Sequence, residues 1–229
     1  MRAYEIVSAG GIDALHLTER PAPEPGPGEV LVRIRASSLN YRDLMTLLDP
    51  ESRAIPYPRI PNSDGAGEVL AVGPGVTRCA PGDRVAGTFF QRWDCGPITA
   101  EAMASALGGA QDGVLAEEVV LDEGGLVHVP AHLSFEEAAT LPCAAVTAWH
   151  ALIGVLTGGQ INPTPIMRKS LTVHGIYVGS RAMFEAMNRA IAAAGLRPVV
   201  DRQFSFDDAR AAFHHMQAAG HFGKIVVTL

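Results

Sequence analysis

Residues 141–159, with the sequence LPCAAVTAWHALIGVLTGG, decide how this chain is organised. Ser134 and Glu137 precede this stretch as a capping box, in which each side chain accepts a hydrogen bond from a free backbone amide at a helix start. The predicted helix runs toward Leu152. The apolar run Ile153–Leu156 then predicts a buried strand, so the helix passes into the strand without an intervening domain.

The composition is that of an ordinary globular chain, with 229 residues, 48% of them hydrophobic, and a formal net charge of −6. One or two domains fit this length. Lys and Arg are scattered singly, which excludes the clustered basic face that nucleic-acid binding needs. Because no stretch reaches the roughly 18 apolar residues of a membrane span, and Met1–Glu5 opens a strand rather than a signal peptide, we expect a cytoplasmic protein with a small-molecule partner.

The first half of the chain predicts short strands separated by glycine and proline turns. Glu29–Ala36 alternates apolar and polar residues, the period of a sheet with one solvent-facing side. A short helix is expected near Tyr41–Leu48. The other expected strands are Met1–Val7, Ala14–Thr18, Asp64–Gly73 and Gly82–Gly87. Such a set favours a compact, partly open β-barrel.

Downstream of the junction, the pattern changes to alternating strands and helices. Arg181–Ala194 predicts a helix that ends at Gly195, a residue suited to left-handed backbone. Apolar residues at helical spacing predict a second helix over Phe206–Met216. Further strands are expected at Leu171–Val178, Pro198–Val200 and Lys224–Leu229, and a loop at Met103–Gly113.

Three motifs resemble those of the medium-chain dehydrogenase/reductase family, in its zinc-independent, quinone-oxidoreductase-like branch. They are SLNYRD at Ser38–Asp43, PNSDGAG at Pro61–Gly67, and LPC at Leu141–Cys143. In zinc-dependent members, a cysteine stands at the position of Asn40 and a histidine at that of Ser63. A catalytic zinc takes three protein ligands. Of these three positions, only that of Cys143 carries a residue type that binds zinc. The resemblance therefore implies no metal site.

The resemblance implies a mixed α+β fold: a GroES-like, partly open β-barrel catalytic domain with a remnant of a Rossmann α/β domain. Its expected parts are 1–133 (catalytic domain), 134–195 (linking helix, residual Rossmann strands and helix) and 196–229 (return to the catalytic domain). Most of the Rossmann domain, which holds the dinucleotide, is missing. Gly65–Leu70 lacks the third glycine of a dinucleotide fingerprint, and Gly154–Gln160 lacks the lysine of a P-loop.

By resemblance, intact relatives transfer a hydride between NADP(H) and a carbonyl, quinone or activated alkene. A developing oxyanion then needs hydrogen-bond donors. Asn40 and Tyr41 are the candidates, with Arg42 and Asp43 in support. Structural alternatives stay open: Asn40 can tie down a turn, Asp43 can cap a helix, and Cys143 can be a small buried apolar side chain.

The cofactor remnant is expected at Gly154, Val155 and Leu156, which by resemblance lie near the nicotinamide. Hydride transfer needs the reacting atoms within about 3–3.5 Å of each other. We therefore expect this chain to be the catalytic domain of a zinc-independent NAD(P)H-dependent oxidoreductase. Because the cofactor-binding segment is absent, we expect the chain to bind no cofactor and to be inactive. The alternative is a non-enzymatic binding or scaffold domain of the same descent. Unpaired strand edges also predict a homo-oligomer joined through Leu171–Val178.

Overall fold

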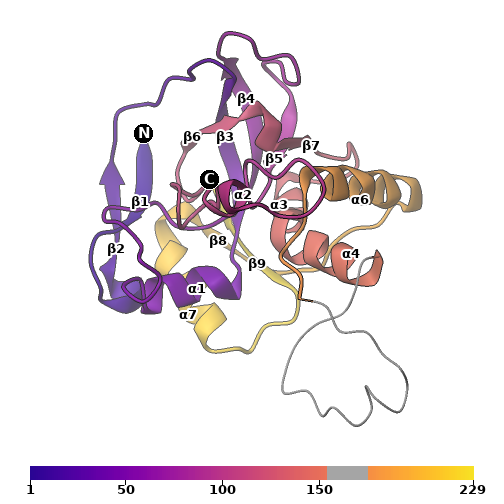
Figure 1. Cartoon of the computed structure of the whole chain (residues 1–229). Helices are drawn as coiled ribbons and strands as arrows, with labels where there is room; N and C mark the ends of the chain where they lie inside the picture. Colours follow the sequence, from indigo (N-terminus) through magenta and orange to yellow (C-terminus); the bar gives the residue numbers. More distant parts are fainter. Residues whose placement is uncertain (154–174) are drawn as a thin grey trace.

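The computed structural model describes residues 1–153 and 175–229, and Figure 1 shows their arrangement. The fold is mixed, as expected, with one large sheet, a small two-stranded sheet and helices on both sides. The strands are β1 (Arg2–Ile6), β2 (Leu15–Glu19), β3 (Glu29–Ser38), β4 (Asp64–Val72), β5 (Arg84–Gly87), β6 (Glu118–Asp122), β7 (Leu126–His128), β8 (Val200–Ser205) and β9 (Lys224–Thr228).

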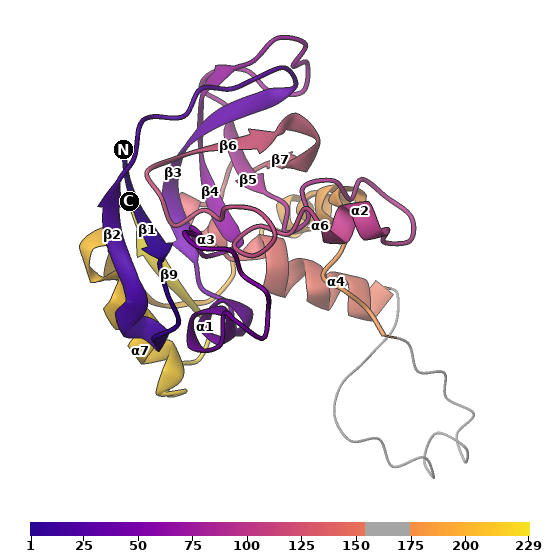
Figure 2. The ribbon, with the colours of Figure 1, turned by 60° about the vertical axis from the view of Figure 1, so that its left-hand side comes forward.

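The helices form two groups, α1 with α7 and α4 with α6, as both views of the ribbon show (Figures 1 and 2). None of the helices described in 1–153 or 175–229 is long and apolar enough to cross a membrane. The helices are α1 (Tyr41–Leu48), α2 (Ala100–Met103), α3 (Phe135–Ala139), α4 (Val146–Ile153), α6 (Arg181–Ala194) and α7 (Ala209–Gln217).

Strand β3 organises the large sheet because it pairs with three other strands. It runs antiparallel to β4 over its length, to β6 along its first half and to β9 at its end. A Cβ on Gly67 of β4 would lie 2.0 Å from the carbonyl oxygen of Arg33. Only glycine permits this approach of the two backbones, so Gly67 serves strand packing.

The last strand returns the C-terminal segment to the first half of the chain. Ser37 of β3 pairs with Val227 of β9, and β9 runs parallel to β8 on its other side. Because successive side chains of a strand point to opposite faces, Ile225 and Val227 join the core beneath α1 and α7, whereas Val226 joins the core beneath α3 and α6. Both cores therefore hold β9 against the end of β3.

Several sequence predictions are confirmed at the level of single residues. Helix α1 spans Tyr41–Leu48. The hydroxyl of Ser134 accepts from the backbone amide of Glu137, whose carboxylate accepts in return from the amide of Ser134. Helix α6 ends at Gly195, which has a φ of 62°. These predictions succeeded because each depends on local backbone chemistry.

The helix predicted to run toward Leu152 is interrupted. A π-helical turn at Leu141–Ala145 separates α3 from α4, because Pro142 has no backbone N–H to continue an α-helix. The predicted strand Ile153–Leu156 is wrong at Ile153, which ends α4, and its other residues lie outside the described ones. Strand β8 begins where the predicted strand Pro198–Val200 ends.

The first half of the predicted strand Leu171–Val178 falls outside the described residues, and its second half, 175–178, is irregular, so the prediction is wrong there. Self-association through it stays a prediction. The sequence reading also missed β6 and β7. The sequence Glu118–Asp122 has three consecutive apolar residues between charged ones, a short apolar run that is typical of a strand.

Candidate active site

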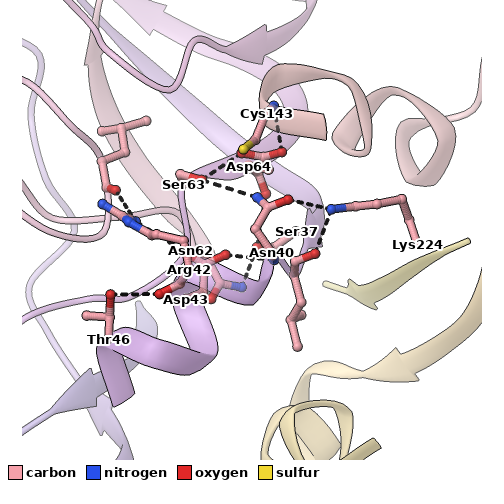
Figure 3. Close-up of polar contacts among 12 residues, drawn as sticks. Ser37, Asn40, Arg42, Asp43, Thr46, Asn62, Ser63, Asp64, Cys143 and Lys224 are labelled. Atoms are coloured by element: carbon pink, nitrogen blue, oxygen red, sulfur yellow. Dashed lines mark hydrogen bonds and ion pairs between the residues drawn. The ribbon is translucent and has the colours of Figure 1, made fainter. Parts of the chain in front are cut away.

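A buried polar cluster forms where β3 passes into α1, and residues from distant parts of the chain complete it (Figure 3). Asn40 lies between the two elements, Ser63 and Asp64 lie at the start of β4, Cys143 lies in the π-helical turn, and Lys224 begins β9. The pairing of β3 with β4 and β9 therefore positions this cluster.

Asn40 stands at the centre of the cluster and is only 7% exposed. Its Oδ1 accepts a hydrogen bond from the Lys224 ammonium at 2.5 Å, and its Nδ2 donates to the Ser63 hydroxyl at 3.4 Å. The Lys224 ammonium also donates to the carbonyl of Leu39 at 2.6 Å. Since an ammonium only donates, its contact fixes which amide atom of Asn40 is the oxygen.

Asp64 is fully buried beside this amide. Its Oδ1 accepts from the Ser63 hydroxyl at 2.6 Å, and its Oδ2 accepts from the backbone amide of Cys143 at 2.9 Å. Burial raises the pKa of Asp64, an effect that the positive charge of Lys224 opposes. Burial also raises the pKa of the Cys143 thiol, and the charge of Asp64 adds to that rise. The cysteine therefore stays a thiol near neutral pH.

Asp43 and Arg42 secure the start of α1. One oxygen of Asp43 accepts from the backbone amide of Asn40 at 2.9 Å, and the other pairs with Arg42 at 3.1 Å. Arg42 also donates to the carbonyl of Leu107 at 2.7 Å, and its guanidinium lies over the ring of Phe89. Burial raises the pKa of Asp43, and the charge of Arg42 opposes the rise.

The predicted site residues have different surroundings. The structure brings Asn40, Arg42 and Asp43 together, whereas Tyr41 is 70% exposed and takes no part in the side-chain hydrogen bonds of the described cluster. The predicted remnant, Gly154, Val155 and Leu156, lies outside the described residues.

Sequence reasoning missed Asp64 and Lys224. A signal existed for each. Asp64 is a charged residue within a glycine-rich strand motif, and Lys224 is one of only two lysines among 18 basic residues. Neither signal pointed to Asn40, because the contact of Lys224 with Asn40 depends on strand pairing across the whole chain.

The donors of this cluster do not fit a zinc ion. Asn40 and Ser63 offer a neutral amide and a hydroxyl, whereas zinc is bound by thiolate, imidazole or carboxylate. Both oxygens of Asp64 already accept hydrogen bonds, and the ammonium of Lys224 lies against the amide oxygen of Asn40. Within 1–153 and 175–229, no group of three His, Cys, Asp or Glu residues could hold a metal ion.

The start of helix α1, which lies at the cluster, does not fit the pyrophosphate of a dinucleotide. A pyrophosphate binds where a glycine-rich turn leads from a strand into a helix, because the free backbone amides there attract an anion. Helix α1 follows β3 directly, but its connection contains no glycine, and the Asp43 carboxylate already accepts from its first free amide. A carboxylate therefore already occupies this helix start, where a phosphate would have to bind.

Each half of the chain matches a family model of known dehydrogenases. Residues 26–131 match the family model "Alcohol dehydrogenase GroES-like domain", and residues 118–227 match the model "Zinc-binding dehydrogenase". The first match confirms the expected GroES-like fold. A crystal structure described as an alcohol dehydrogenase from Sinorhizobium meliloti 1021 superposes with a TM-score of 0.90 at 29% identity, covering 100% of this chain and 98% of that one.

Curated relatives show how much of the sequence is shared. A zinc-type alcohol dehydrogenase-like protein of Schizosaccharomyces pombe is 29% identical, with 96% of each chain covered. That match extends over 333 residues, against 229 in this chain, so about a hundred residues of the relative have no counterpart here. A synaptic vesicle membrane protein VAT-1 homolog of Rattus norvegicus is 35% identical over 66% of this chain, which spans only 33% of that relative's length.

Proposed function

Because this chain belongs to the alcohol dehydrogenase-like family of medium-chain dehydrogenases/reductases, we propose that it is the catalytic, substrate-binding domain of a zinc-independent oxidoreductase. Its substrate class is a carbonyl compound, a quinone or an activated alkene. The observation that carries the proposal is the buried amide of Asn40, which lies between a hydroxyl and an ammonium where a metal ligand would otherwise stand.

Zinc independence is supported by the chemistry of that cluster. Any metal at Asn40 would have to displace the Lys224 ammonium from the amide oxygen. Without a metal, hydrogen-bond donors must stabilise the negative charge that develops on the substrate oxygen. The second hydrogen of the Asn40 amide and the exposed hydroxyl of Tyr41 are the donors we propose. Arg42 and Asp43 hold the start of α1 and so position both.

We also propose that the chain by itself lacks NAD(P)H-dependent activity. The family consists of NAD(P)-dependent dehydrogenases, but this sequence contains no G-x-G-x-x-G fingerprint. About a hundred residues of the relative from Schizosaccharomyces pombe are also missing. A loosely held nicotinamide would rarely reach the distance that hydride transfer requires.

The absence of the dinucleotide fingerprint from the sequence also favours a second candidate function. A domain that keeps the barrel and the polar cluster, but not the nucleotide cradle, can serve as a non-enzymatic binding or scaffold domain. Such a domain would bind carbonyl compounds without converting them. Both functions predict that the chain binds a carbonyl compound, so they are separated by turnover: reduction of that compound with NADPH would exclude the non-enzymatic function.

Calorimetric titration with NADPH, together with thermal unfolding in its presence and absence, tests the proposal. An intact member of the family is the positive control. We expect no saturable binding by this chain and no increase in its melting temperature. Saturable binding at micromolar NADPH, with turnover of a quinone or an enone, would overturn the proposed inactivity.

A further inference from the structure

Lys224 is an unusual choice of residue for this chain. Only two of its 18 basic residues are lysines, and the other is Lys169. A guanidinium is broad and planar, whereas an ammonium is a compact point charge that directs three donors in different directions. The one described lysine lies at the polar cluster, where a small cation fits against a buried amide.

The hydrogen bonds of Lys224 leave one donor available. Its half-buried ammonium donates to the carbonyl of Leu39 and to Oδ1 of Asn40, at 2.6 Å and 2.5 Å. Both acceptors belong to the link between β3 and α1, which is anchored by Asp43 and Arg42. The position of the ammonium is therefore fixed, and its third N–H has no acceptor among the described residues.

The charges of the cluster indicate which ligand this N–H suits. Arg42 neutralises Asp43 through a direct ion pair, and Lys224 is the described cation that opposes the effect of burial on the pKa of Asp64. With two cations facing two carboxylates, the cluster has little net charge. It therefore favours a neutral, polarisable oxygen over an anion, whose attraction to Lys224 the carboxylates would cancel.

Apolar side chains beside the cluster restrict the ligand further. Phe89, Phe90 and Trp93 form a buried aromatic group, and Cys143 packs against it. Arg42 lies over Phe89 and so joins this group to the polar cluster. Because these rings are themselves buried, they give the cluster apolar surroundings, which suit an uncharged, conjugated compound better than an ion.

We infer that Lys224 is a catalytic residue of this site, whose third N–H binds and polarises the carbonyl oxygen of an aryl or α,β-unsaturated ketone. This role rests on the proposed function as a carbonyl-binding domain, and it is specific to a residue that the family resemblance did not supply. A hydrogen bond from a charged donor is about twice as strong as one between neutral groups. Binding itself makes and breaks no covalent bond, so it needs no cofactor to be observed.

The probe is 4-dimethylaminobenzylideneacetone, a coloured enone whose absorption moves to longer wavelength when its carbonyl is polarised. It is titrated into the full chain and into the variants Lys224→Met and Lys224→Arg. The matched control is Arg84→Met, because Arg84 is also a half-buried cation that donates to two backbone carbonyls, those of Ala131 and Leu133. Circular dichroism checks that each variant folds.

We expect a red shift on binding to the full chain and to Arg84→Met. The shift should be lost in Lys224→Met and reduced in Lys224→Arg, which keeps the charge but displaces it. An equal shift in the full chain and Lys224→Met, or no binding to the full chain, would overturn the role of Lys224. Tight NADPH binding would overturn only the proposed inactivity, since this titration contains no nucleotide.

A second measurement covers the case in which Lys224→Met does not fold. Lysine labelled with ¹³C at Cε adds only two signals to the spectrum of the full chain, because the chain has two lysines. Comparison with Lys224→Arg assigns the Lys224 signal. That signal should move in proportion to the bound enone, and an unchanged signal at saturating enone would contradict direct contact.

Discussion

The ammonium of Lys224 lies 2.5 Å from Oδ1 of Asn40, although the two residues are 184 positions apart in the chain. Two backbone pairings make this contact possible. β9 pairs with the end of β3, and the backbone amide of Leu39 donates to the carbonyl of Ile225 at 3.0 Å. The integrity of the site thus depends on the return of the C-terminal segment to the first half of the chain.

Replacing Asn40 by alanine should destabilise the fold. The change leaves the Lys224 ammonium and the Ser63 hydroxyl without their shared partner in a buried setting. Such a loss costs about 1–3 kcal/mol. Urea unfolding of Asn40→Ala measures the change in the free energy of unfolding. Gln203→Ala, at an exposed position, should differ from the unmodified chain by less than about 0.5 kcal/mol. Equal effects of the two substitutions would show that the Asn40 contacts contribute nothing to stability.

The buried carboxyl of Asp64 should make stability depend on pH. Burial raises its pKa in the folded state above the usual 3.8, so the folded state binds this proton more tightly than the unfolded state does. Its contribution to the free energy of unfolding is therefore fully present below the unfolded pKa and is lost as pH rises through the folded pKa.

Asp64→Asn removes this titration while keeping an oxygen that can accept from the Cys143 amide. Relative to the unmodified chain, the variant should gain stability as pH rises above about 4. Urea unfolding at a series of pH values tests this, with Asp94→Asn, at an exposed position, as the control. If the two curves for Asp64→Asn and the unmodified chain stay parallel, Asp64 does not titrate differently on folding.

The sequence predicted those parts of the fold and site that local chemistry determines. The bounds of α1, the capping box at Ser134 and the end of α6 at Gly195 each depend on a few neighbouring residues. The sequence grouped Asn40, Arg42 and Asp43 because they occupy one short motif. Lys224 was not grouped with them, because its place beside Asn40 depends on a strand order that no local pattern contains. The break before α4 was also missed, although Pro142 signalled it.

The three cysteines should differ in their reactivity. Cys95 is exposed, Cys79 is buried, and burial raises the pKa of the Cys143 thiol. Because the thiolate is the reactive form, 5,5′-dithiobis(2-nitrobenzoate) at pH 8 should modify one thiol in a fast phase and the others slowly. In Cys95→Ser the fast phase should disappear. A fast phase that persists in Cys95→Ser but is lost in Cys143→Ser would show that Cys143 carries a thiolate.

Self-association should proceed through apolar side chains on both sides of residues 154–174. Leu152 is 78% exposed at the end of α4, and Tyr177 is 50% exposed just before α6. Leaving such large apolar side chains in water is unfavourable, so a second copy of the chain that covers them stabilises the pair. Light scattering at micromolar concentration should therefore give a mass above that of one chain.

The double variant Leu152→Glu and Tyr177→Glu should shift the mass toward the monomer. The double variant Gln203→Glu and Gln217→Glu, which adds two charges at exposed polar positions, controls for charge repulsion alone. A monomeric mass for the unmodified chain would contradict the prediction, and so would an equal shift in the control.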